Sequence, residues 1–146
     1  MFLRALFAFL ALPGIIAFLL PALIASPTPP QFSLFAIAAL LPGVFGLLSC
    51  VYHFYVNGKG TLAPWSPPQH LVTTGLYRFS RNPMYVSVLL ILVGWALTYH
   101  SMSLVIYTGM ATLIFHLRVV FGEEPWLAQT HGEIWQRYQQ AVPRWF

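Results

Sequence analysis

Four long apolar runs, almost free of charge, constrain this chain more than any other feature of its sequence. A soluble domain carries about 25% charged residues, whereas here 58% of the 146 residues are hydrophobic and 7% are charged. A helix needs about 20 apolar residues to cross the hydrocarbon core of a bilayer. The sequence therefore predicts one membrane-embedded domain over residues 1–146, an all-α polytopic membrane helical bundle of about four transmembrane helices. The predicted spans are roughly 5–25, 32–56, 83–99 and 102–121.

The same runs allow two alternatives to four spans. Buried core helices of a soluble protein are also apolar, but such a protein needs far more polar surface than this composition provides. The first run follows Arg4 and ends in small residues at Ala25 and Ser26, as a secretory signal peptide does. Its apolar part is longer than the roughly 7–15 residues of a signal core, which favours a retained span.

Lysine and arginine are distributed unevenly between the segments that connect the runs. The connections at 26–31 and around residue 100 contain none, while the loop 57–82 and the tail 122–146 contain Lys59, Arg78, Arg81, Arg137 and Arg144. Because positive residues stay in the cytoplasm, the loop, the tail and both termini are predicted to be cytoplasmic. The net charge of +4 is therefore mostly a topology signal, and the basic residues form no dense patch that predicts nucleic-acid binding.

Most polar residues that could perform chemistry lie in the loop 57–82 and the tail 122–146. Prolines and glycines predict an irregular path for the loop. The tail contains the chain's three acids, and two of them, Glu123 and Glu124, are adjacent. Apolar residues at near-helical spacing predict amphipathic helices along the membrane surface, namely Leu127, Ile134, Trp135, Tyr138 and Val142.

Several common catalytic arrangements are absent from the sequence. The chain has no Asp, which excludes a Ser-His-Asp triad. Its five histidines are scattered without the spacing of a metal site, so no metal is expected. The single cysteine, Cys50, cannot form an internal disulfide. No Gly-rich fingerprint of a Rossmann cofactor domain is present.

The remaining charged residues near the predicted membrane boundary have two interpretations. Arg78 and Arg81 could anchor a helix end at the lipid headgroups, with Glu123 and Glu124 capping or neutralising them. The same four residues could instead form a binding site. Their types and positions alone are compatible with both.

Two motifs resemble a known group of enzymes. The run GLYRFSRNPMY, from Gly75 to Tyr85, and FGEEPW, at Phe121–Trp126, resemble the integral membrane methyltransferases that include isoprenylcysteine carboxyl methyltransferase and phosphatidylethanolamine N-methyltransferase. The family pattern is Arg-His-Pro-x-Tyr-x-Gly, followed after a span or two by Glu-Glu. The ending HGEIWQRYQQAVPRW is also similar, so the resemblance covers about 57–145.

The sequence departs from the family pattern at a few positions. Asn82 stands in place of the histidine and Ser87 in place of the glycine. Asn-Pro-Met-Tyr also occurs in the phosphatidylethanolamine branch. That branch carries a Gly-x-Gly in the span before the loop, which is matched imperfectly here by Gly43 and Gly46.

The resemblance implies a methyltransferase that uses S-adenosylmethionine and acts on a lipidic or apolar acceptor, such as an isoprenylcysteine carboxylate or a phospholipid amine. Arginine suits the cofactor's carboxylate, acidic residues suit its amine and hydroxyls, and aromatic rings suit adenine and the sulfonium. The loop and the tail are expected to cover the cofactor. The expected catalytic residues are Arg81, Tyr85 and Glu123. The expected cofactor-binding residues are Arg78, Arg81, Asn82, Pro83, Met84, Tyr85, His116, Glu123 and Glu124.

Glu123 and Glu124 are not expected to play the same part. Adjacent side chains on a helix diverge by about 100°, so both cannot face the cofactor. We expect one, by preference Glu123, to bind the cofactor. The other is expected to hold the tail closed by pairing with Arg78, Arg81 or Arg144, because a buried carboxylate without a partner is costly.

Two functions of other classes remain as alternatives. A nicotinamide-dependent membrane reductase is one, because sterol reductases use a related fold, and it would bind a dinucleotide. A non-catalytic membrane scaffold or channel subunit is the other. The confinement of the polar motifs to one side, without charges along a path through the membrane, argues against a channel. The sequence does not identify the methyl acceptor.

The charge asymmetry predicts the sidedness of the loop and the tail. Cysteines introduced by Gly60→Cys and Gln140→Cys should react with an impermeant thiol reagent from the cytoplasmic face only, because positive segments stay on that side. Labelling of the two positions from opposite faces would rule this topology out.

Overall fold

The computed structural model describes residues 10–25, 29–58 and 70–146, and within these ranges the chain is helical, without a β-strand. Residues 5–9 of the first predicted span, Ser26, and the loop residues 59–69 with Lys59 lie outside the described ranges. In chain order the elements are η1 (Leu10–Leu19), α2 (Leu20–Ala25), α3 (Leu34–Val56), η2 (Gly75–Arg78), α4 (Pro83–Tyr99), α5 (Met102–Arg118), η3 (Val119–Glu123) and α6 (Glu124–Ala141). The predicted all-α fold is confirmed for these residues.

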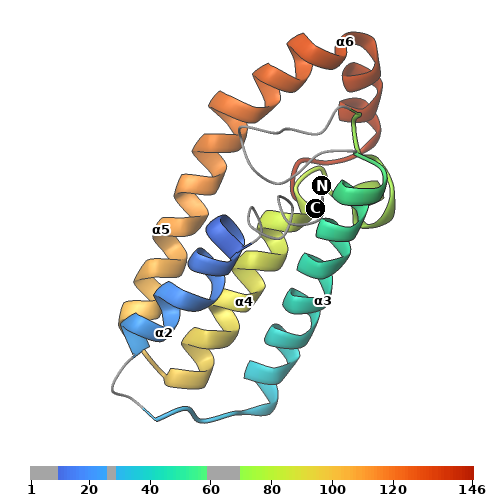
Figure 1. Ribbon diagram of the computed structural model, residues 1–146. Helices are drawn as coiled ribbons and strands as arrows, with labels where there is room; N and C mark the ends of the chain where they lie inside the picture. Colours follow the sequence, from blue (N-terminus) through green and yellow to red (C-terminus); the bar gives the residue numbers. More distant parts are fainter. Residues whose placement is uncertain (1–9, 26–28, 59–69) are drawn as a thin grey trace.

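The long helices form a bundle from which α6 projects. Helices α3, α4 and α5 run side by side, and η1 with α2 packs against α4 and α5 (Figure 1). Through the π-helical turn η3, α5 continues into α6 beyond the end of the bundle. At Gly132 the backbone adopts φ 51° and ψ −121°, which breaks the helix, and the chain turns back toward the bundle (Figure 1). The predicted tail helices are therefore the two parts of α6.

Local sequence signals set several of the helix boundaries. The hydroxyls of Ser33 and Ser101 accept hydrogen bonds from Ala36 N and Leu104 N, which caps α3 and α5. Pro83 occupies the first position of α4, where a backbone N–H would have no partner within the helix, so a proline without an N–H fits there. These signals place the observed starts at or near the predicted boundaries at 32, 83 and 102.

Two helical stretches, Leu34–Val56 and Met102–Ala141, are long and apolar enough to cross a membrane by length and composition. Pro13–Ala25 and Pro83–Tyr99 are apolar but shorter, so crossing by these two remains a prediction. Large apolar side chains of α3, among them Phe35, Leu41 and Phe45, are exposed on the outside of the bundle. An exposed apolar face of this size suits contact with lipid rather than water.

Close packing of α3 against α4 depends on two glycines. A Cβ atom on Gly43 would lie 2.8 Å from Ile91 Cγ1, 2.9 Å from Ile91 N and 3.0 Å from Ser87 O, and one on Gly46 would overlap the Ser87 hydroxyl. Small residues allow helix backbones to approach closely where lipid provides no hydrophobic driving force. The glycine pair therefore has a packing role in this structure, and it fixes the helix that begins with the Asn-Pro-Met-Tyr motif.

Pro21 leaves one carbonyl of the first helix without its donor, and two hydrogen bonds attach this part of the chain to the bundle. Proline has no N–H, so the carbonyl one turn earlier loses its donor; that carbonyl belongs to Ala17 in α-helical and to Ile16 in π-helical geometry. Trp95 Nε1 donates to Ala17 O at 2.9 Å, and the Tyr107 hydroxyl donates to Ile16 O at 3.1 Å. Side chains of α4 and α5 thus satisfy backbone carbonyls that an apolar environment cannot.

The two ends of the bundle differ in their connections. At one end Gln31 N donates to Thr98 O at 2.8 Å. At the other end Arg81 N donates to Pro143 O at 2.9 Å, which joins the start of α4 to the chain's last residues. The basic segments before α4 and after α6 therefore share one end of the bundle, and the side of the membrane that this end faces stays a prediction.

Replacing Gly43 by Ala should destabilise the bundle by about 1–3 kcal/mol, the usual cost of overpacking, because the new methyl group meets backbone atoms of α4. The measurement is the free energy of unfolding in detergent micelles. Gly109→Ala is the matched control, since nothing lies within 4 Å of its Cβ position; helix propensity predicts a gain there of up to about 1 kcal/mol. Equal effects of the two changes would contradict the packing role.

Candidate functional site

The segment before α4 and the chain's last residues are joined by three hydrogen bonds. Besides the bond from Arg81 N to Pro143 O, Asn82 Nδ2 donates to Arg144 O at 3.0 Å and Ser80 Oγ donates to the same carbonyl at 3.3 Å. Asn82, the first residue of the Asn-Pro-Met-Tyr motif, thus binds a backbone carbonyl of the tail. This attachment positions Arg144 beside the start of α4.

Glu124 lies between two arginines, and these three residues are called the Glu124 cluster. Arg144 binds the carboxylate with two hydrogen bonds, Nε to Oε1 at 2.9 Å and Nη2 to Oε2 at 2.8 Å, a paired geometry that strengthens the contact. Arg81 Nη1 lies 2.8 Å from Oε1, and the Arg81 and Glu124 side chains are only 8% and 11% exposed. Two guanidinium groups and one carboxylate leave one positive charge uncompensated within the cluster.

The buried side chain of Arg81 leaves some of its N–H groups without hydrogen bonds to described residues. Its guanidinium lies over the Trp135 ring, 5.5 Å from the centroid, and its buried Nε and Nη1 atoms form no hydrogen bond with any residue of 10–25, 29–58 or 70–146. The Nη1 contact with Glu124 is therefore an ion pair whose geometry is not that of a hydrogen bond. Burial lowers the pKa of Arg81 and the Glu124 carboxylate opposes that shift, but arginine stays charged in proteins. Buried N–H donors left free are costly, and a ligand with acceptor oxygens would satisfy them.

Residues of α6 fix the walls around Arg81. The Tyr138 hydroxyl donates to Tyr77 O at 2.7 Å, which ties α6 to η2. Burial raises the pKa of Tyr138 to about 12, so it is a neutral donor at physiological pH. Trp135, Tyr138 and Val142 form a small buried cluster beside this contact. The second part of α6 therefore acts as a wall of the site rather than as a loosely attached surface helix.

Glu123 is held in a second cluster, the Glu123 cluster, with Tyr85 and Arg118. The Tyr85 hydroxyl and Arg118 Nε both donate to Glu123 Oε1, the latter at 2.9 Å. The π-helical turn η3 (Val119–Glu123) brings together residues five positions apart, such as Arg118 and Glu123. The Glu123 side chain is 34% exposed, and neither of these contacts uses its Oε2 atom. The Glu123 carboxylate is therefore partly exposed at the polar end of the bundle.

The structure brings together some of the predicted site residues and separates others. Arg81, Asn82, Tyr85, Glu123 and Glu124 lie in or against the two clusters. Pro83 and Met84 pack at the start of α4, Pro83 buried and Met84 against the apolar core. Arg78 is exposed and forms no ion pair with a described residue, while His116 on α5 faces the chain's last residues. Of the arginines predicted to pair with a glutamate, Arg81 and Arg144 do so and Arg78 does not.

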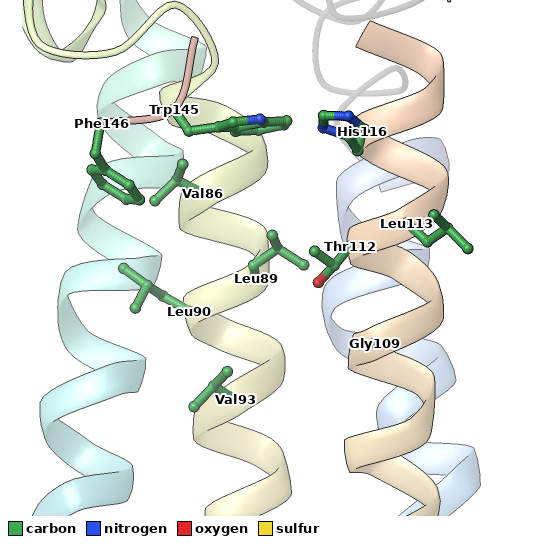
Figure 2. Close-up of a pocket in the computed structure, with 10 residues that line it drawn as sticks. All are labelled: Val86, Leu89, Leu90, Val93, Gly109, Thr112, Leu113, His116, Trp145 and Phe146. Atoms are coloured by element: carbon green, nitrogen blue, oxygen red, sulfur yellow. The ribbon is translucent and has the colours of Figure 1, made fainter. Parts of the chain in front are cut away.

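A groove of about 570 Å³ lies between α4 and α5 beside the clusters (Figure 2). The His116 and Trp145 rings stack across its polar end, with centroids 6.1 Å apart. Figure 2 shows Phe146 on the α4 side of this end. This α4–α5 groove is lined by Val86, Leu89, Leu90, Val93, Gly109, Thr112, Leu113, His116, Trp145 and Phe146.

Sequence reasoning missed three residues that shape the site: Arg118, Trp135 and Trp145. Arg118 looks like the last residue of a span, and only its spacing of five to Glu123, in a helix with a π turn, indicates the contact. Trp135 and Trp145 reach the site because α6 reverses at Gly132. No local pattern indicates that reversal, since a single glycine in an amphipathic helix is common.

The arrangement combines three chemical capacities at one end of the bundle. The Glu124 cluster has one excess positive charge and free N–H donors, which suits an anion such as a carboxylate. The Glu123 carboxylate suits an amine or hydroxyl group, and the groove suits a hydrocarbon chain. No group of three or more metal-ligating side chains occurs within 10–25, 29–58 and 70–146.

Comparison with known families places these features in context. The sequence model of the phospholipid methyltransferase family matches residues 34–134, which is more than half of the chain. The match confirms the resemblance that the two motifs indicated. It includes both glutamates and the start of α4, whereas Arg144 and Trp145 lie beyond it. No curated protein and no solved structure matches the chain significantly.

Replacing Glu124 by Gln should release the tail. The change removes the charge that compensates Arg81 and Arg144, and loss of one partner of a buried pair costs about 3–5 kcal/mol. We therefore expect a lower free energy of unfolding in detergent and faster proteolysis of the last residues.

Glu133→Gln is the matched control for that variant. Glu133 pairs with Arg137 at 3.8 Å, with both side chains more than 80% exposed, and exposed pairs contribute about 0–1 kcal/mol. A Glu124→Gln protein as stable and as protease-resistant as Glu133→Gln would show that the buried pair does not hold the tail.

Proposed function

This chain belongs to the phospholipid methyltransferase family of membrane enzymes, and on that premise we propose that it transfers a methyl group from S-adenosylmethionine to a lipidic or apolar acceptor. Methyl transfer is the activity of the family in general. The identity of the methyl donor and the class of the methyl acceptor are proposed in addition.

The observation that carries the proposal is the buried guanidinium of Arg81. Its Nε and Nη1 atoms lack hydrogen-bond partners, and the Glu124 cluster to which it belongs has one excess positive charge. The carboxylate of S-adenosylmethionine would satisfy the free donors and balance that charge. Anchoring to lipid headgroups explains a buried arginine less well, because an anchor needs access to the headgroup layer.

The remaining residues of the two clusters also fit the cofactor. The accessible carboxylate of Glu123 suits its amine or its ribose hydroxyls, in line with our preference for Glu123 over Glu124 as the cofactor-facing acid. The rings of Trp145 and His116 offer surfaces for adenine or for a positive charge. When bound, S-adenosylmethionine supplies an electrophilic methyl group attached to a sulfonium.

The protein's part in such a transfer is mainly alignment and exclusion of water. Arg81 lies just before α4 and Tyr85 lies in its first turn, and the packing of α3 against α4 keeps the start of α4 in place. Arg144 and Asn82 hold the tail over the site. An acceptor that arrives as a carboxylate or thiolate needs no base, whereas an amine must be neutral, and Glu123 is then the acid–base group available.

The acceptor is proposed to enter sideways from the membrane. The α4–α5 groove is open and almost entirely apolar, and its polar end lies at Trp145, next in sequence to Arg144 of the Glu124 cluster. An apolar acceptor could therefore keep its hydrocarbon part between the helices while its reacting group reaches the clusters.

Glu123→Gln should weaken binding of S-adenosylmethionine by tenfold or more, because a charged hydrogen bond is worth about 1.5–3 kcal/mol. Isothermal titration calorimetry on protein in lipid nanodiscs measures the affinity. Arg137→Gln serves as the control, since that exposed side chain lies outside both clusters, and its affinity should equal that of the parent.

The parent protein tests the broad proposal. Incubation with labelled S-adenosylmethionine and a membrane extract should yield a labelled lipid. Absence of cofactor binding at millimolar concentration, or binding that a nicotinamide dinucleotide abolishes by competition, would contradict the proposal, the second result in favour of a reductase.

A further inference from the structure

The α4–α5 groove is built from one row of side chains on each helix. Val86, Leu90 and Val93 follow each other at intervals of three or four residues along α4, and Gly109, Thr112 and His116 do the same along α5 (Figure 2). Residues at this spacing share one helix face. Two parallel rows border one elongated, open and apolar groove along the helix axes, a shape that suits an extended hydrocarbon chain.

The middle of the groove provides no free polar group. Its one hydroxyl, on Thr112, donates to Thr108 O at 2.8 Å within α5. The other polar groups of the described lining residues belong to His116 and Trp145, which stack at one end of the groove. A ligand with a hydrocarbon body and one polar end would therefore lie with that end at Trp145, because a buried polar group elsewhere in the groove would lack a partner.

Gly109 marks the opposite end of the groove. It lies seven residues from His116, which is about 10 Å along a helix, and Val93 lines the same end from α4 (Figure 2). Nothing lies within 4 Å of its Cβ position. Helix packing does not require a glycine there, in contrast to Gly43 and Gly46. A larger residue at 109 would project into open space and shorten the groove.

We infer that the groove binds one hydrocarbon chain of the methyl acceptor and that Gly109 determines how long a chain it accepts. This inference rests on the proposed function, since the occupant is the acceptor of that reaction. The polar end of the groove is lined by Trp145, the neighbour in sequence of Arg144 in the Glu124 cluster. A chain seated in it would therefore present its polar end to the proposed site.

The test uses Gly109→Leu, which fills the open end without strain and favours the helix. The probes are phosphatidylethanolamines whose one acyl chain, short or long, ends in a photoactivatable diazirine, with the protein in phosphatidylcholine nanodiscs. In the parent protein the long-chain probe should label the groove near Val93. In Gly109→Leu the affinity for the long-chain probe relative to the short-chain probe, from competition labelling, should fall about tenfold. That is the loss expected when roughly two methylene groups no longer fit.

Met110→Phe is the matched control, because it adds bulk at the neighbouring position, about 100° around the helix. Met110 is exposed and lies outside the groove, so the affinity ratio should stay at the parent value. An equal shift in both variants would overturn the inference, because bulk anywhere on α5 would then suffice. Labelling of the parent spread evenly over the groove and the exposed face of α3 would also overturn it, as ordinary contact with bilayer lipid.

Photolabelling does not depend on methyl transfer, which keeps the two proposals separable. If the parent protein methylates a lipid and Gly109→Leu keeps the parent's ratio of long-chain to short-chain affinity, the proposed function stands. The role of Gly109 is then contradicted. Groove labelling with the expected shift, in a protein that methylates no lipid, supports the chain site and contradicts the proposed function. Crosslinking of the groove to a second copy of the chain would identify it as a protein interface and overturn the inference.

Discussion

The polar end of this protein depends on the Glu124 carboxylate, which two arginines from distant parts of the chain share. Arg81 precedes α4, Glu124 begins α6, and Arg144 lies two residues before Phe146. Each buried charge would be costly alone, so the three segments stabilise one another. Because the cluster still has one excess positive charge and free N–H donors on Arg81, it is both a structural joint and a site prepared for an anion.

The apolar body of the bundle makes that joint possible. An apolar bundle offers no partners for charged groups, and the charged side chains of the described residues gather at one end of it or on α6. Gly43 and Gly46 fix α4 against α3, and this packing determines where Arg81 and Tyr85 lie. The π turn η3 then sets the two adjacent glutamates apart, one toward Tyr85 and Arg118 and the other toward the tail. A small chain thereby obtains two acidic positions of different exposure from neighbouring residues.

The tail links the charged site to the apolar groove. Arg144 is part of the Glu124 cluster, and the next two residues, Trp145 and Phe146, line the groove. Any movement of the tail therefore changes both at once. The last part of the tail, residues 135–146, lies outside the stretch that matches the family. The matched part therefore provides the glutamates and the start of α4, while Arg144, Trp145 and Phe146 come from beyond it.

The sequence by itself determined the features that depend on composition and local pattern. The helical class, the starts of α3, α4 and α5, and the candidate residues Arg81, Tyr85, Glu123 and Glu124 follow from apolar runs, capping residues and short motifs. A family relationship was also readable, because its motifs are contiguous. The sequence likewise required one glutamate to take an arginine partner, since adjacent helical residues diverge.

Only the tertiary structure decided which groups meet. The pairing of Glu124 with both Arg81 and Arg144, the exposure of Arg78, the contact of Arg118 with Glu123 and the groove beside His116 depend on how separate helices pack and where α6 reverses. These are contacts between residues far apart in the chain or across an irregular turn. The helix propensity of a local segment does not predict such contacts. They are stabilised by burial and by charge compensation, which exist only once the segments are assembled.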